Sequence, residues 1–201
     1  MNYLNSAFIV QFYGILMSSP PAAVKKREYH LKYEVDMLIE IARRSIYNKE
    51  QWDDSESNAH CESFLVHVRN ITYFLFGPYR NDDICPLHFC SNYNSVQDPH
   101  IAGEKESDFV GRINKQIDHL TTNRTIPPNR NWNVNGISCD LLRYLLNFLK
   151  EADRMDKSYR DKLTSEVNDF LNKECGNNIQ SQVSMSTVTV SGTIATPYHP
   201  D

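Results

Sequence analysis

The chain has 201 residues, of which 40% are hydrophobic and 11% aromatic, so it is long enough to bury one sizeable core. Its formal net charge of -4 disfavours a globally basic nucleic-acid binder, although a local basic patch remains compatible with it. The five cysteines are an odd number in irregular spacing, which favours a reducing cytosol over a disulfide framework and predicts a cytoplasmic protein.

Residues 1–23 are expected to form an N-terminal extension that packs on the core, packs on a partner or precedes the natural start. Its apolar stretch, 7–17 (AFIVQFYGILM), is interrupted by Gln11 and Gly14 and has no Lys or Arg before it, unlike a secretory signal. It is also shorter than the ~20 apolar residues that span a bilayer, so we expect no membrane insertion.

Apolar residues at three- and four-residue steps predict five helices, over 27–48, 54–76, 105–122, 135–152 and 156–173. The second helix has N-cap residues from Asp53 to Ser55, and Gly77-Pro78 ends it. We expect the first two helices to form an antiparallel hairpin. The connection 78–103 shows no periodicity apart from a predicted turn of helix at 83–89.

These elements predict an all-α protein, a bundle of four to five helices over residues 24–175, with irregular N- and C-terminal tails. The C-terminal tail, 176–201, is rich in polar residues and is expected to be disordered. Residues 181–191 could form a strand, but the sequence suggests no partner strand for it.

The third predicted helix carries the first candidate site. Arg112 and His119 are seven residues apart and therefore lie on one side of a helix. Arg112 supplies a permanent cation, and His119 can exchange a proton near neutral pH. The stretch 112–130 has four basic residues and one acidic residue, an asymmetry that contrasts with the acidic chain.

The second predicted helix contributes Glu62, His67, Arg69 and Asn70. They are polar residues on a helix that otherwise serves the core. One interpretation is a buried, mutually satisfied network in which Glu62 lies opposite Arg112 or Arg124. The other interpretation is a functional surface, and the sequence leaves both open.

Cys85, His88 and Cys90 form a compact Cys-x2-His-x-Cys cluster, to which His60-Cys61 could add a ligand. The spacing lacks the second half of a usual zinc knuckle, and Cys61 lies on the apolar face of its helix. We therefore predict no metal site.

Several segments resemble an uncharacterised family of bacterial all-helical proteins with the pattern ESFLxHxRN…RINxxIxHLTxxR. They are the runs 62–74, 82–84, Arg112-Ile-Asn114, His119-Leu-Thr-x-x-Arg124 and Trp132. More distantly, Arg112 and His119 resemble the Arg-x(4–6)-His motif of HEPN-superfamily domains. The chain has Ile113 where those motifs favour a polar residue, and Asn114 follows it.

The resemblance to HEPN domains implies a HEPN-like helical bundle that acts as a homodimer and cleaves or binds RNA without a metal or other cofactor, in stress, toxin–antitoxin or phage defence. It implies catalytic roles for Arg112, His119 and Asn114. Substrate contacts would come from Lys115, Thr121, Arg124, Arg69 and Asn70. The alternative is a non-catalytic module that binds an antitoxin or other protein, in which Glu62 and His67 belong to a structural polar network.

Overall fold

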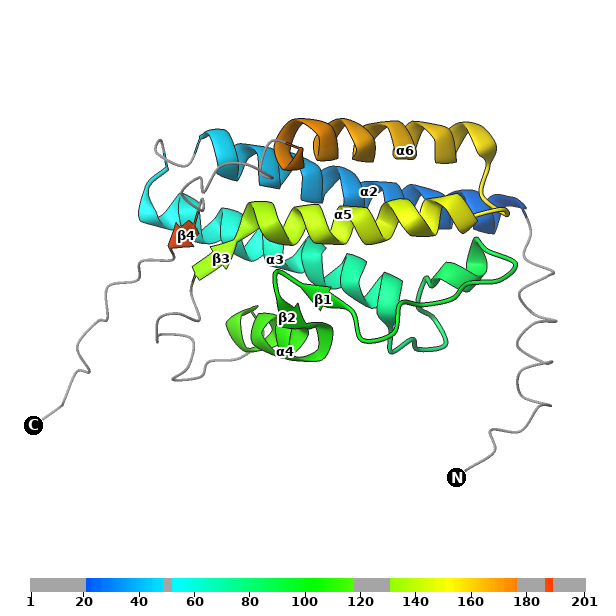
Figure 1. Cartoon of the computed structure of the whole chain (residues 1–201), viewed down its shortest axis with the longest axis horizontal. Helices are drawn as coiled ribbons and strands as arrows, with labels where there is room; N and C mark the ends of the chain where they lie inside the picture. The colour runs from blue at the N-terminus through cyan, green and yellow to red at the C-terminus, as the bar shows by residue number, and fades with distance from the viewer. Residues whose placement is uncertain (1–20, 49–51, 118–130, 177–186, 190–201) are drawn as a thin grey trace, which may run out of the picture.

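Five α-helices account for most of the chain that the computed structural model describes, which is residues 21–48, 52–117, 131–176 and 187–189. The helices are α2 (Pro21–Tyr47), α3 (Asp54–Phe76), α4 (Glu106–Ile117), α5 (Val134–Glu151) and α6 (Lys157–Phe170). Figure 1 shows α2, α3, α5 and α6 side by side, with α4 next to α3 at the edge of the bundle. The predicted all-α bundle is therefore confirmed.

Helices α2 and α3 form the predicted antiparallel hairpin, with α3 running back along α2 (Figure 1). Asp53 caps α3 by accepting a hydrogen bond from the amide of Glu56 at 2.8 Å, and Glu56 accepts one from the amide of Asp53. This reciprocal capping box stabilises the first turn of the helix. Gly77 ends α3 with a φ of 81°, which favours glycine.

The core is built from the apolar stripes that the sequence predicts. Each helix turns one such face toward its neighbours, and large side chains such as Phe64, Phe109 and Phe148 are almost fully buried. Helix α4 is confirmed as far as Ile117, while residues 118–122 of the predicted third helix lie outside the described part. The elements thus follow local apolar periodicity.

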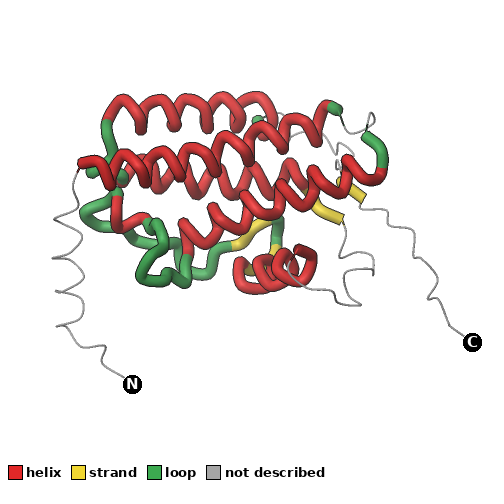
Figure 2. Tube along the Cα trace, turned by 180° about the vertical axis from the view of Figure 1, so that it is seen from behind, coloured by secondary structure: helices red, strands yellow, loops and turns green. Residues whose placement is uncertain are grey.

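The long connection between α3 and α4 contains short elements. A 3-10 turn at Pro86–His88 matches the predicted turn of helix, but strands β1 (His100–Ile101) and β2 (Glu104–Lys105) were not predicted. They pair as an antiparallel hairpin, with Ile101 opposite Glu104. The two turn residues, Ala102 and Gly103, have φ values of 51° and 84°, as a tight hairpin of primed type requires. Figure 2 shows this hairpin next to α4.

A second small sheet joins the C-terminal tail to the bundle. Strand β3 (Asn131–Asn133) pairs antiparallel with β4 (Thr187–Thr189), and Trp132 is opposite Val188. The prediction of a disordered tail is therefore wrong for 187–189, since β3 supplies the partner strand that the sequence did not suggest. The rest of the tail beyond Gly176 lies outside the described residues.

A disulfide joins Cys139 of α5 to Cys175, in the π-helical turn Leu171–Cys175 that follows α6. The prediction against disulfide bonding is wrong for this pair, because the fold brings together two thiols that are 36 residues apart. Cys61, Cys85 and Cys90 are buried free thiols. Burial raises the pKa of Cys61 and of Cys90 to about 12, which keeps both protonated.

Within the described residues, no helix is both long and apolar enough to cross a bilayer. The apolar stretch 7–17 lies outside the described residues.

Candidate functional site

Arg112 lies on α4 between a carboxylate and an indole. Its Nε and one terminal nitrogen donate to the two carboxylate oxygens of Glu104, at 3.2 and 2.7 Å. The guanidinium carbon lies 3.8 Å from the ring centroid of Trp132, a cation–π contact. Only 21% of the Arg112 side chain is exposed.

Glu104 was missing from the predicted site. It belongs to strand β2, and the tight turn at 102–103 places it beside α4. Glu104 holds the guanidinium of Arg112 bidentately. The sequence analysis instead placed Glu62 opposite Arg112 or Arg124, and Arg124 lies outside the described residues. Glu62 is exposed on α3.

Helices α3 and α4 meet through a second polar contact. Arg69 donates to the Oδ1 of Asn114 at 3.4 Å, and the amide nitrogen of Asn114 donates to the hydroxyl of Tyr73 at 3.3 Å. All three side chains are half-buried. Two residues that the sequence assigns to the site, Arg69 and Asn114, are thus brought together, and Tyr73 is an addition that the sequence analysis missed.

His67 belongs to a polar group between α2 and α3. Its Nδ1 lies 2.7 Å from the Oε2 of Glu34, which also accepts a hydrogen bond from Asn70 at 3.2 Å. His67 is buried, and the ring of Tyr33 packs edge-on against it with centroids 5.8 Å apart. This geometry is compatible with the structural role predicted for His67, whose carboxylate partner is Glu34.

The remaining predicted site residues divide into two groups. Lys115 is exposed on α4. His119, Thr121 and Arg124 lie outside the described residues, so the geometry between Arg112 and His119 is not described.

The thiol and imidazole cluster of the 85–90 segment does not assemble a metal site. The Sγ of Cys85 lies 3.5 Å from the Nδ1 of His88, but the part of the chain that the structure describes holds no group of three potential metal ligands. Burial, with a smaller contribution from the positive charge of Arg27, lowers the pKa of His88, and burial raises that of Cys85. His60 is instead stacked on Trp52 at a centroid distance of 4.0 Å.

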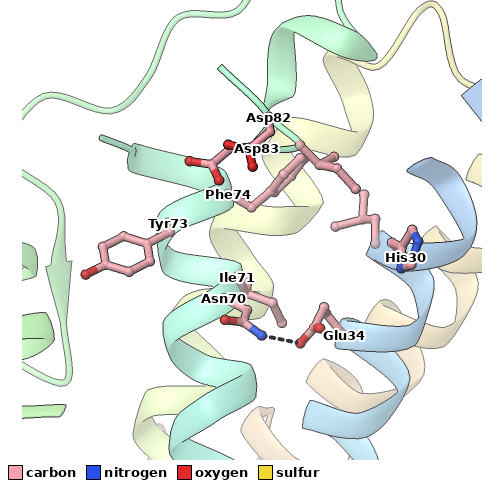
Figure 3. A pocket seen from close by; sticks show the side chains of 10 residues that line it. His30, Glu34, Asn70, Ile71, Tyr73, Phe74, Asp82 and Asp83 are labelled. Atoms are coloured by element: carbon pink, nitrogen blue, oxygen red, sulfur yellow. Dashed lines mark hydrogen bonds between the residues drawn. The ribbon is translucent and has the colours of Figure 1, made fainter. Parts of the chain in front are cut away.

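A surface recess of about 380 Å³ lies between α2, the C-terminal half of α3 and the segment that follows α3. Figure 3 shows Asp82 and Asp83 at one end and Glu34, hydrogen-bonded to Asn70, at the other. Tyr73 lines the recess but points away from Glu34 and His30. The sequence analysis included Asp82 and Asp83 in the run 82–84 but did not connect them with Glu34, because Glu34 comes from an element far away in the chain.

Comparison of the chain with family models, with curated proteins and with solved structures found no match. The resemblance to HEPN domains therefore stays a prediction.

Proposed function

We propose that the chain is a non-catalytic helical module that binds a partner protein, and that its polar residues on α3 and α4 hold the bundle together. The position of Arg112 carries this proposal. Its guanidinium forms two hydrogen bonds to Glu104 and is covered by Trp132. A guanidinium that is neutralised by a carboxylate of its own chain is poorly placed to stabilise charge on a phosphate.

The exposed tyrosines of α2 support a role in protein binding. Tyr29 and Tyr33 are 67% and 47% exposed and lie one turn apart. Tyrosine offers a large, rigid contact area and is enriched at protein interfaces. These side chains give α2 an aromatic surface beside the recess, since Tyr33 packs on His67, the partner of Glu34.

The second candidate function is metal-independent cleavage of RNA by a homodimer. It is favoured by the contact between Arg69 and Asn114, which places two of its proposed residues at one junction of α3 and α4. In this mechanism the ribose 2′-hydroxyl loses its proton to a base and attacks the adjacent phosphate, and the bond from phosphorus to the 5′-oxygen breaks. The products are a 2′,3′-cyclic phosphate and a 5′-hydroxyl that receives a proton, with His119 as the base or the acid. Arg112 would have to exchange Glu104 for the phosphoryl oxygens.

An RNase assay in the presence of EDTA separates the two candidates. Purified protein, its His119→Ala variant and a Lys157→Ala control are incubated with single-stranded RNA, and the products are resolved on a denaturing gel. The interaction module predicts that all three proteins leave the RNA intact. Cleavage by the wild type and the control that His119→Ala abolishes would overturn the interaction proposal and support the nuclease.

A further inference from the structure

The recess between α2 and α3 combines an apolar floor with a negatively charged rim. Its floor is formed by Leu31, Ile71, Phe74 and Ile84, of which the first three are buried. A volume of about 380 Å³ is within the range of small-ligand pockets, roughly 300–1,000 Å³. The recess is thus large enough for one long side chain, and its floor suits the aliphatic part of that side chain.

The rim presents three carboxylates, those of Glu34, Asp82 and Asp83. Among the described residues that line the recess there is no lysine or arginine, and His30 is the single histidine. Figure 3 shows the two aspartates across the apolar floor from Glu34. Carboxylates on both sides of an apolar floor make the recess electrostatically complementary to a cation that has an apolar stem.

The carboxylates keep the capacity to accept further hydrogen bonds. Glu34 uses its Oε2 for both His67 and Asn70, and its side chain is 25% exposed. Asp83 accepts through its Oδ2 from the backbone amide of Arg80 at 2.6 Å. Each carboxylate has about four acceptor positions, so both can still accept bonds from an ammonium or guanidinium group.

From this geometry we infer that the recess binds a lysine or arginine side chain of a partner protein, with its aliphatic stem on Leu31, Ile71 and Phe74 and its cationic group at the carboxylate rim. This inference rests on the proposed function and names the chemistry of the partner. A protein segment fits better than a free amine, because the exposed ring of Tyr33 extends the contact surface beyond the recess. Nucleic acid is disfavoured by the negative rim.

Binding is tested by titrating the ¹⁵N-labelled full chain with the peptide acetyl-Ala-Leu-Arg-Leu-Ala-amide at low salt, and with the same peptide carrying citrulline in place of arginine. Citrulline keeps the shape of arginine and removes its charge. The arginine peptide is expected to shift the amide resonances of the lining residues and to bind about tenfold more tightly than the citrulline peptide.

Two variants locate the site. Asp82→Asn removes a charge from an exposed rim residue and is expected to weaken binding by about threefold, and Asp82→Asn with Glu34→Gln by about tenfold. Asp108→Asn, an exposed acid of α4 outside the recess, should leave the affinity unchanged. Because Glu34→Gln could alter the fold through His67, the single variant Asp82→Asn decides the test if the double variant unfolds.

Equal binding of the arginine and citrulline peptides, or shifts that lie outside the recess, would overturn this inference. So would an affinity that responds equally to Asp82→Asn and Asp108→Asn. Each of these results leaves the RNase assay unaffected, whereas RNA cleavage lost in His119→Ala would remove the proposed function without changing the peptide titration. The two failures are therefore distinguishable.

Discussion

The guanidinium carbon of Arg112 lies 3.8 Å from the centroid of the Trp132 indole, and this contact joins α4 to β3. Trp132 is fully buried, and its Nε1 has no hydrogen-bond partner within the described residues. The indole therefore stabilises the fold through two ring contacts. Its face covers the guanidinium of Arg112, and its ring packs edge-on with that of Phe109. This arrangement predicts that Arg112 contributes to stability.

Arg112→Ala should lower the free energy of unfolding by about 1–3 kcal/mol, because it removes a cation–π contact and a bidentate ion pair. Urea denaturation measures this loss. The matched control is Arg143→Ala, whose pair with Asp140 is exposed and should contribute less than about 0.5 kcal/mol. Equal losses in the two variants would contradict a special role for Arg112.

The coupling between Arg112 and Glu104 can be isolated with a double-mutant cycle. Glu104→Gln and Arg112→Ala are combined, and their unfolding free energies are compared with those of the single variants. We expect a coupling of about 1 kcal/mol, since the two side chains share two hydrogen bonds. Additive losses would indicate that Arg112 acts through contacts other than that with Glu104, such as its contact with Trp132.

The disulfide between Cys139 and Cys175 should be measurable directly. Thiol titration in denaturant is expected to give the three free cysteines without reductant and all five after reduction. Reduction should destabilise the chain by about 2–4 kcal/mol, because the bond closes a loop of 36 residues in the unfolded state. The Cys139→Ala/Cys175→Ala variant is the control, and reductant should not change its stability. Five reactive thiols without reductant would refute the bond.

His88 should make stability depend on pH. Burial, with a smaller contribution from the charge of Arg27, lowers its pKa below the usual 6.5, so the unfolded chain binds the proton more strongly than the folded chain. Stability from this residue is therefore full above pH 6.5 and is lost as the pH falls toward the folded-state pKa. The amide of Cys85 donates to Nδ1 at 3.0 Å, which also requires that nitrogen to be unprotonated.

His88→Gln should remove this contribution to the pH dependence. Urea denaturation of both proteins between pH 5 and 7.5 is expected to show a wild-type advantage that shrinks as the pH falls. A constant difference across that range would mean that the proton affinity of His88 is the same in the folded and unfolded chains.

The N-cap of α3 provides a test of a purely local feature. Asp53→Ala should cost about 1 kcal/mol, because the amide of Glu56 loses its acceptor. Asp53→Asn keeps an acceptor oxygen and should cost less. Thermal or urea denaturation measures both, and equal costs would show that the cap contributes through charge rather than through the hydrogen bond.

The positions of the helices were predictable because apolar periodicity, capping residues and Gly77 act over a few neighbouring residues. The buried apolar face of α3 and its N-cap at Asp53 were predicted correctly for this reason. The antiparallel α2–α3 hairpin followed from the short connection between two amphipathic helices. The structural role predicted for His67 stays a prediction, and its contact with Glu34 is compatible with it.

Tertiary structure alone decided which polar side chains meet. Glu104 became the partner of Arg112 because a tight turn at Ala102-Gly103 folds a two-residue strand back beside α4, and the sequence shows no apolar pattern for so short a strand. The β3–β4 pair and the disulfide likewise form only because the fold brings together segments that are far apart in the sequence. Ion pairs, strand partners and disulfides are non-local contacts, whose identity depends on the packing of whole elements, whereas the formation of a helix depends mainly on its own residues.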